Sequence, residues 1–268
     1  FRSFIRHLNQ SSDKMGGGSG VRFDEDVFMN SFTSVKDISD RKRVFETYIE
    51  SLYLAQTGKI LSEEKRIVEK SVEHGEFAQE LSLLFPEARF VHVVRNPYAN
   101  LVSLRRYKSR DFGYPIMRRL VRTLYNSYYY LYRNQRTIRN YRIIRYEDIT
   151  ADPDNWISSL CSFLGLDYED ILSRPTSNGQ LWTGNSSYGT QHTAISSSGS
   201  GTWKDEITAM ETIYVNRLFP FVIRDYGYEP FEKKGSFWTP GPGENGKRYA
   251  ANRLYPFLLQ EWKRSTRD

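Results

Sequence analysis

Residues 89–103 read Arg89-Phe-Val-His-Val-Val-Arg95-Asn-Pro97-Tyr-Ala-Asn-Leu-Val-Ser103, and this stretch decides the fold. It starts with an apolar, β-branched run over 90–94, interrupted by His92, which is typical of a parallel strand covered on both faces. Asn96-Pro97 stops the strand, because proline has a fixed φ and no amide donor, and the pair suits a helix N-cap and first helical position. The stretch therefore predicts a strand, a tight break and a helix.

This pattern places Arg95 at the carboxyl end of a buried strand and beside a helix N-terminus. Ser103 follows eight residues later, about two turns into the helix. Helix N-termini offer free N–H groups and partial positive charge, and arginine adds a planar fork for phosphate. Ligands of open α/β sheets also gather at the carboxyl ends of strands. Arg95, Asn96 and Ser103 are therefore candidate anion ligands, although a surface arginine and a helix-face serine explain the pattern equally well.

Other apolar patterns predict the remaining elements. Ile67-Val68 is interpreted as the end of a second strand, and 141–146 as a third. Residues 21–40 are polar, with scattered Phe, and are expected to form a mobile or substrate-facing excursion. Helices are expected over 1–8, 40–56, 73–85, 115–139, 153–164 and, with a break at Pro220, 205–225.

Composition sets bounds on the function. The 268 residues suffice for one large α/β domain, and a net charge of +6 fits an anionic ligand such as a nucleotide. The single cysteine excludes an internal disulfide and argues against a cysteine-based metal site. No apolar run approaches the roughly 20 residues of a membrane span, and no signal peptide is visible. Together with the single cysteine, this favours a cytoplasmic location, although the chain does not begin with Met and an upstream anchor or leader stays open.

Eight segments occur in the order in which one enzyme family carries its motifs. They are Lys70-Ser-Val-Glu-His74, Leu84-Phe-Pro-Glu-Ala-Arg89, Arg95-Asn-Pro-(five residues)-Ser103, Arg145-Tyr-Glu-Asp148, Asp152-Pro153, Phe163-Leu-Gly-Leu166, Gly201-Thr-Trp-Lys204 and Gly227-Tyr-Glu-Pro230. The ordered set covers roughly residues 65–230 and resembles the sulfotransferases that use 3′-phosphoadenosine-5′-phosphosulfate (PAPS), in their broad bacterial form.

The resemblance implies a P-loop nucleoside-triphosphatase-like α/β fold, with three α/β/α layers around a central parallel sheet. It implies transfer of a sulfonate from PAPS to a hydroxyl or amine of a small-molecule, lipid or carbohydrate acceptor, with 3′,5′-adenosine bisphosphate (PAP) as product. No metal and no nucleic-acid partner are expected. The family's N-terminal strand and 5′-phosphosulfate loop are not found here, so we expect them to be missing from a sulfotransferase domain over 1–230. A C-terminal extension over 231–268 is expected to pack a helix on the domain or on a second copy in a homodimer.

The resemblance also assigns roles to residues. Arg95, Asn96 and Ser103 would hold the 3′-phosphate, while His74 would be the base for the acceptor and Lys70 a cationic neighbour of the sulfonate. Glu69 and Glu73 are rival bases, and an exposed His74 and a solvated Lys70 are the plain alternative. The second nucleotide-binding loop would include Ser198, Gly199, Trp203 and Lys204.

Several alternatives stay open. Serines 196–198 replace the family's Arg-Lys-Gly, and Trp203 is explained equally by a role as anchor of its loop. The basic cluster Arg105, Arg106, Lys108 and Arg110 lines an anionic substrate path or, as is commoner, forms a solvated face. As whole-protein alternatives, a non-catalytic nucleotide- or polyanion-binding module and an ATP-dependent small-molecule kinase both fit a basic α/β chain. The Gly-rich stretch 15–20 lacks the context of a Walker loop, which argues against the kinase.

Overall fold

A computed structural model describes residues 2–14, 22–63, 65–70, 74–112, 117–177, 180–181, 194–195, 197 and 201–234. Its contacts divide the chain into two compact units, one formed by 1–89 with 169–194 and the other by 90–168 with 195–268. Each unit is described by itself. The domain boundary expected near residue 230 stays a prediction, and the expected C-terminal helix lies outside the described residues.

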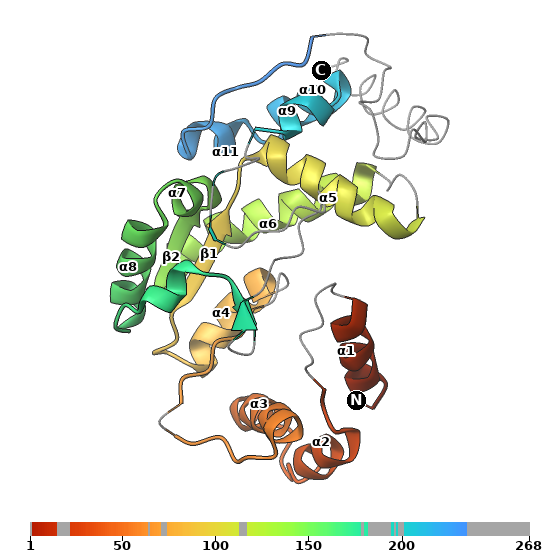
Figure 1. Cartoon of the computed structure of the whole chain (residues 1–268), viewed down its shortest axis with the longest axis vertical. Coiled ribbons are helices and arrows are strands. Elements are labelled where there is room, and N and C mark those ends of the chain that lie inside the picture. Colours follow the sequence, from red (N-terminus) through yellow and green to blue (C-terminus); the bar gives the residue numbers. More distant parts are fainter. Residues whose placement is uncertain are drawn as a thin grey trace. The chain divides into compact units, whose positions relative to one another are not determined.

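The second unit contains the two strands predicted most directly from sequence. Strands β1 (Phe90–Val94) and β2 (Tyr141–Arg145) pair in parallel, in register from Phe90 beside Tyr141 to Val94 beside Arg145 (Figure 1). The connection between them runs through two helices, as a parallel crossover requires. The fold is therefore a mixed helix and strand structure with a small parallel sheet.

Two expectations about the sheet are wrong. Residues 65–70 have no regular secondary structure, so Ile67-Val68 is not a strand, and the parallel sheet has two strands within the described residues. Val91 and Val93 of β1 are 38% and 48% exposed, so the strand is not covered on both faces as expected. A pair of apolar residues among charged neighbours is too short to nucleate a strand, and an apolar pattern does not specify what packs on it.

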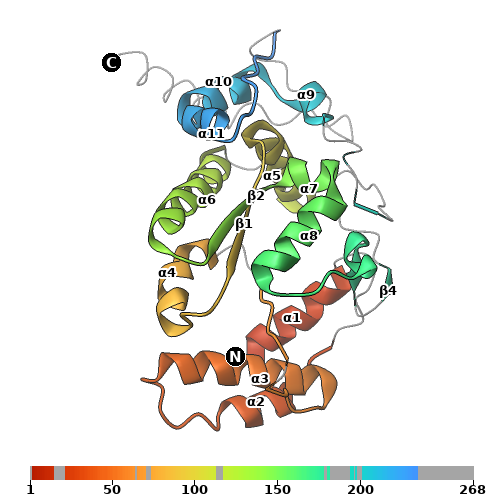
Figure 2. The ribbon, with the colours of Figure 1, turned by 90° about the vertical axis from the view of Figure 1, so that its left-hand side faces the viewer.

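Within the described residues the second unit has seven helices, and Figure 2 shows α6 and α8 on either side of the strand pair. They are α5 (Pro97–Phe112), α6 (Met117–Thr137), α7 (Tyr146–Ala151), α8 (Pro153–Leu164), α9 (Trp203–Glu206), α10 (Ala209–Leu218) and α11 (Pro220–Asp225). Gly165 ends α8 in the left-handed conformation and Pro220 starts α11, both as predicted. A further break before α10 was not predicted; Thr208 caps that helix in a capping box with Glu211.

The core of this unit is built by α5 and α6 together with α9–α11. Helix α6 contributes side chains at a spacing of three or four residues, Leu120, Leu124, Tyr128 and Leu131, all almost fully buried. Tyr128 is therefore a core residue. Cys161 is buried and unpaired, as expected of an inert core cysteine.

The first unit is mainly helical. It contains α1 (Arg2–Lys14), α2 (Glu25–Phe32), α3 (Arg41–Thr57), α4 (His74–Leu84), the 3₁₀ turn Asp170–Ser173 and the short antiparallel pair β3 (Thr176–Ser177) and β4 (Gln180–Leu181). Of the described helices, none is long and apolar enough to cross a membrane.

Helix α2 lies within residues 21–40, where the sequence predicted an excursion and no helix. Asp24 caps it by accepting from the N–H groups of Asp26 and Val27, both at 2.9 Å. Phe28 is fully buried and packs in a cluster with Ile5 and Ala55. The helix was missed because eight residues with one fully buried side chain give a weak periodic signal, and its stability comes from tertiary packing.

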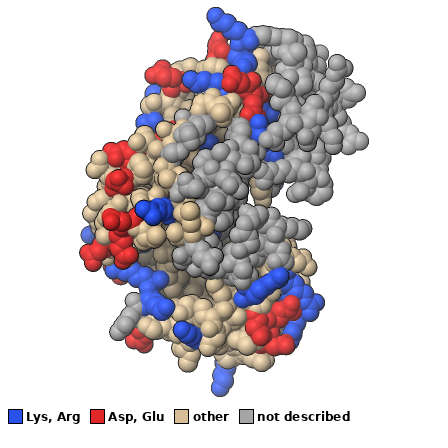
Figure 3. All heavy atoms as spheres, viewed as in Figure 1, with Lys and Arg blue, Asp and Glu red and all other residues tan. Residues whose placement is uncertain are grey.

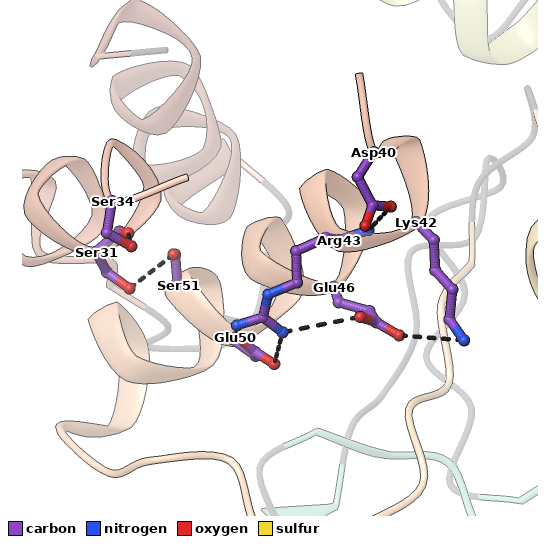
Figure 4. Close-up of polar contacts among 8 residues, drawn as sticks. All are labelled: Ser31, Ser34, Asp40, Lys42, Arg43, Glu46, Glu50 and Ser51. Carbon is purple, nitrogen blue, oxygen red and sulfur yellow. Dashed lines mark hydrogen bonds and ion pairs between the residues drawn. The ribbon is translucent and has the colours of Figure 1, made fainter. Parts of the chain in front are cut away.

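Polar contacts connect α2 with α3 and order the face of α3. Ser51 Oγ lies 2.8 Å from Ser31 Oγ, and Asp40 caps α3 by accepting from the N–H of Arg43 (Figure 4). On the exposed face of α3, Arg43 pairs with Glu50 at 3.2 Å and approaches Glu46 at 3.8 Å. Exposed pairs of this kind contribute little, so the buried aromatic cluster holds these helices together.

The basic cluster on α5 is organised differently from either sequence interpretation. Arg105 is 2% exposed, and its Nε lies 2.8 Å from Oε1 of Glu211, which is 1% exposed. Arg106 pairs in the same way with Glu206. Neither arginine lines a solvated face or an open anionic path, because each is neutralised by a carboxylate about 100 residues away in sequence. The side chains of Lys108 and Arg110 lie outside the described residues.

Removing one member of the buried pair should strongly destabilise the protein. We expect Arg105→Leu to lower the free energy of unfolding by about 3–5 kcal/mol, because Glu211 is left buried and charged without its partner. Urea denaturation monitored by tryptophan fluorescence measures the change. Arg122→Leu, at an exposed position of α6, is the control and should change stability by about 0.5 kcal/mol or less. Equal urea midpoints for the two variants would contradict the assignment of Arg105 and Glu211 as a buried ion pair.

His92 should make stability depend on pH. Its Nδ1 lies 2.6 Å from the Tyr141 hydroxyl, and burial lowers its pKa from 6.5 to about 4. Below pH 6.5 the unfolded chain therefore binds a proton that the folded chain does not, so stability falls as the pH falls from 6.5 towards 4. Between pH 7.5 and 5, wild type should lose up to about 2 kcal/mol more than His92→Gln, measured by urea denaturation. Equal losses in both proteins would contradict this.

Candidate functional site

The turn between β1 and α5 has the local structure that its sequence predicts. Asn96 Oδ1 accepts from the N–H of Tyr98 at 3.0 Å and of Ala99 at 3.3 Å, and Pro97 is the first helical residue. Arg95 therefore lies between the last residue of a parallel strand and the N-terminus of a sixteen-residue helix. This is the arrangement in which α/β proteins bind anions.

The side chain of Arg95 is held by an aromatic ring. Its guanidinium carbon lies 4.5 Å from the centroid of the Tyr146 ring, a cation–π distance. Its Nε is buried and has no hydrogen-bond partner among the described residues. Because a buried N–H without an acceptor is costly, this nitrogen is available to a ligand oxygen.

The backbone of the same turn is tied from two directions. The Tyr128 hydroxyl donates to the carbonyl oxygen of Arg95 at 3.2 Å, and burial raises the pKa of Tyr128, so the hydroxyl keeps its proton. The N–H of Asn96 donates to Oε1 of Glu147 at 2.9 Å. These two bonds fix the peptide group that joins Arg95 to Asn96, on the C-terminal side of the Arg95 side chain.

Glu147 connects three segments that are distant in sequence. Its Oε2 accepts from the Tyr228 hydroxyl at 3.1 Å, while Oε1 accepts from Asn96. Burial and the charge of Glu147 raise the pKa of Tyr228, so the hydroxyl stays protonated and donates at neutral pH. The guanidinium of Arg145 lies 4.9 Å from the Tyr228 ring centroid. The Arg-Asn-Pro, Arg-Tyr-Glu-Asp and Gly-Tyr-Glu-Pro segments therefore meet in one hydrogen-bonded cluster.

Ser103 lies further along α5 and is partly buried. A residue seven positions after Asn96 projects from the same side of an α-helix, about 10 Å along the axis. Ser103 therefore shares a helix face with the N-cap of the candidate anion site. That the Ser103 hydroxyl binds a phosphate stays a prediction.

Two residues expected in the second nucleotide-binding loop lie in different surroundings. Trp203 lies in the core and Lys204 lies at the surface. Trp203 is 7% exposed and stacks on Tyr98, with ring centroids 5.2 Å apart and ring planes within 6°. Its edge-on contact with Phe231 fixes the segment after α11, which supports the interpretation of Trp203 as an anchor. The Lys204 side chain is exposed, and its carbonyl oxygen accepts from Lys233 Nζ at 2.7 Å. Ser198 and Gly199 lie outside the described residues, and the nucleotide-binding role of all four stays a prediction.

The candidate catalytic residues belong to the first unit, which does not contain Arg95. Lys70 is exposed at the end of the irregular segment 65–70, and Glu69 is exposed beside it. His74 is the first residue of α4, but its side chain, like Glu73, lies outside the described residues. That these residues lie beside the sulfonate stays a prediction.

Charges on the visible surface are mixed. On the face drawn in Figure 3, lysines and arginines are interspersed with acidic side chains wherever grey atoms do not cover them. Among the described residues, no group of three His, Cys, Asp or Glu side chains is placed to hold a metal ion.

Sequence reasoning missed four residues of the site: Tyr128, Tyr146, Glu147 and Tyr228. The motifs that carry the resemblance include Tyr146, Glu147 and Tyr228. No pattern in the sequence predicts that they contact Arg95 or Asn96. The signal that connects them is the parallel register, because Val94 pairs with Arg145 and the next residues of the two strands are Arg95 and Tyr146.

Comparison with known proteins identifies the family. A model of the sulfotransferase family matches residues 6–170, more than half of the chain. The chain belongs to the sulfotransferase family. No curated protein matches the chain.

The solved structures that resemble the chain include two sulfotransferase domains. The sulfotransferase domain from the Synechococcus PCC 7002 olefin synthase is 20% identical, over 82% of this chain and 80% of that chain, with a TM-score of 0.53. The sulfotransferase domain from the curacin biosynthetic pathway is 18% identical, over 78% of this chain and 81% of that chain, with a TM-score of 0.47. The first likeness shows that the sulfotransferase shares the fold of such domains.

The Glu147 cluster should contribute measurably to the stability of the sulfotransferase. We expect Glu147→Ala to lower the free energy of unfolding by about 1–3 kcal/mol, because the Asn96 N–H and the Tyr228 hydroxyl both lose their acceptor. Urea denaturation measures the change. Glu229→Ala, which removes an exposed carboxylate next to the same motif tyrosine, is the control and should be nearly neutral. A neutral Glu147→Ala would show that this cluster does not hold the turn.

Proposed function

We propose that this sulfotransferase moves a sulfonate group from PAPS to a hydroxyl or amine of an acceptor. The observation that carries the proposal is Arg95, whose buried Nε lacks a hydrogen-bond partner in the described structure and whose position is the junction of a parallel strand and a helix N-terminus. Membership of the sulfotransferase family supports the reaction class. We also propose the three-layer P-loop-like architecture, which agrees with a parallel crossover through α5 and α6.

The residues around Arg95 fit the 3′-phosphate that distinguishes this nucleotide. A phosphate needs hydrogen-bond donors and positive charge, and Arg95 supplies both in a planar fork. The helix dipole of α5 favours a negative group at the same point. Ser103, on the face of α5 that carries Asn96, would add a hydroxyl donor.

PAPS, when bound, supplies a sulfonate activated by its phosphate leaving group. Sulfonate transfer resembles phosphoryl transfer, so the protein's contribution is mainly positioning and stabilisation of charge. We assign Lys70 to offset charge on the sulfonate oxygens and His74 to accept the proton of the acceptor, with Glu69 and Glu73 as rival bases. These assignments rest on the motif Lys70-Ser-Val-Glu-His74.

Binding of PAP tests the nucleotide site. We expect PAP to raise the melting temperature of the full chain, since a ligand at 100 times its Kd stabilises the native state by about 2.7 kcal/mol. 5′-AMP, which lacks the 3′-phosphate, should shift it much less. Arg95→Ala should abolish the difference between PAP and AMP, whereas the control Arg122→Ala, at an exposed arginine of α6, should keep it.

Other outcomes would contradict this function. A shift with ATP–Mg²⁺ but not with PAP would favour a kinase, and no shift with PAP would argue against the site. Turnover is tested by transfer of label from radiolabelled PAPS to hydroxyl- and amine-bearing acceptors. Selective PAP binding without transfer to any acceptor would favour a non-catalytic binding module.

A further inference from the structure

Helix α6 carries basic and aromatic side chains on its outer face. Its 21 residues include five arginines and five tyrosines, but no aspartate or glutamate. One set of exposed residues follows a spacing of four, three, four and seven positions, which places them on one side of an α-helix. This set, named the α6 patch, is Arg118, Arg122, Tyr125, Tyr129 and Arg136. The buried residues of α6, such as Leu124 and Leu131, lie on the opposite side, so the patch is not part of the core.

The charges of the α6 patch are not neutralised by the described part of the chain. None of its three arginines forms an ion pair with a described residue. The exposed arginines of α1 behave differently, because Arg2 and Arg6 each pair with a carboxylate of α2, at 2.8 and 2.9 Å. The α6 patch therefore presents positive charge that a partner of opposite charge can neutralise.

The composition of the α6 patch is typical of a protein interface. Arginine and tyrosine are enriched at such interfaces and among the residues that dominate their binding energy, whereas lysine, which α6 lacks, is depleted. Tyr125 and Tyr129 occupy the middle of the patch and are 52% and 53% exposed, with arginines on both sides along the helix. The surface that complements the patch is therefore apolar in its middle and acidic at both ends.

Two other occupants fit the α6 patch less well. A helix that lies in a membrane interface buries its apolar face among the lipids, but the apolar face of α6 is already filled by the core of its own unit. A second copy that packed the same patch against this one would bring the arginines of both copies together without a carboxylate. A protein with an acidic surface avoids both problems.

We propose that the α6 patch docks the acidic face of a partner protein. Carboxylates of the partner contact the arginines at the two ends of the patch, and an apolar side chain packs on Tyr125 and Tyr129. The patch is about 27 Å long and about 10 Å wide, which is less than the roughly 800 Å² that each protein buries in a standard interface. The contact is therefore weak and sensitive to salt.

Docking on the α6 patch leaves the turn at Arg95 uncovered. Tyr128, whose hydroxyl donates to the carbonyl oxygen of Arg95, belongs to the buried side of α6. Figure 2 shows the strand pair on the inner side of this helix. The proposal is therefore independent of the ligand that the turn binds, and failure of one does not decide the other.

Binding of a designed peptide to the full chain tests the proposal. The probe is a fluorescently labelled, alanine-rich helix of about 20 residues, with glutamates at both ends of one face and leucines in the middle of that face. A scrambled peptide of the same composition lacks this face. In fluorescence anisotropy the helical peptide should have a lower Kd than the scrambled one, and its Kd should rise with salt concentration.

Matched variants separate the α6 patch from the net charge of the chain. We expect Arg118→Glu/Arg136→Glu to raise the Kd of the helical peptide about 5- to 30-fold, because two attractive contacts become repulsive. Lys36→Glu/Lys59→Glu, at exposed positions of the first unit, lowers the net charge by the same amount and should change the Kd less than about twofold. If urea denaturation shows that the reversed variant folds poorly, Arg118→Gln/Arg136→Gln replaces it.

A further variant tests the middle of the α6 patch. Tyr125→Ser/Tyr129→Ser should raise the Kd of the helical peptide about 3- to 10-fold, because the leucines lose their contact. Both tyrosines are half-exposed, so their removal opens no core cavity.

Several outcomes would overturn the proposal. It fails if either patch variant binds the helical peptide like wild type, if the control variant loses as much affinity, or if wild type binds the scrambled peptide equally well. Phosphatidylserine vesicles or duplex DNA that bind the patch more tightly than the helical peptide would overturn it in favour of a membrane or a nucleic acid.

Discussion

The parallel register of β1 and β2 is the constraint on which the rest of the candidate site depends. It aligns Val94 with Arg145, and the two chains then leave the sheet at the same edge. Arg95 and Asn96 consequently meet Tyr146 and Glu147, residues about 50 positions away in sequence. A one-residue slip of this register would exchange the two faces of the strand and separate both contacts.

The hydrogen bonds of Glu147 hold the turn between β1 and α5 in place. One carboxylate accepts from the backbone of Asn96 and from the hydroxyl of Tyr228, so the start of α5, the start of α7 and the segment after α11 are connected. Buried hydrogen bonds to a charged acceptor are stronger than neutral ones. The site is therefore built on backbone that the fold holds in place, as phosphate recognition requires.

Charge within the second unit follows one physical rule. Arginines that stabilise the fold, Arg105 and Arg106, are neutralised by carboxylates of α9 and α10, since an unpaired charge would be costly to bury. Arg95 is held by an aromatic ring instead, which keeps its charge. This difference separates the structural arginines from a candidate ligand-binding one.

Local signals in the sequence were interpreted correctly where the physics is local. The N-cap at Asn96, the left-handed Gly165 and the restart of the helix at Pro220 depend on the conformational preferences of a few neighbouring residues. The predictions failed where burial in the folded protein determines whether a strand or a helix forms. Ile67-Val68 does not pair with a sheet and has no regular secondary structure. Helix α2 forms despite its weak apolar pattern because Phe28 is buried in a cluster.

The sequence by itself determined the strand, the turn and the helix around Arg95, and the ordered motifs that indicate a sulfotransferase. The reason is that φ restriction, capping and apolar periodicity act over a few residues. Only the tertiary structure decided that Tyr146 holds Arg95, that Glu147 ties Asn96 to Tyr228, and that Arg105 is a buried structural residue. Those partners lie far apart in the chain, and strand register and helix packing, which no local pattern specifies, bring them into contact.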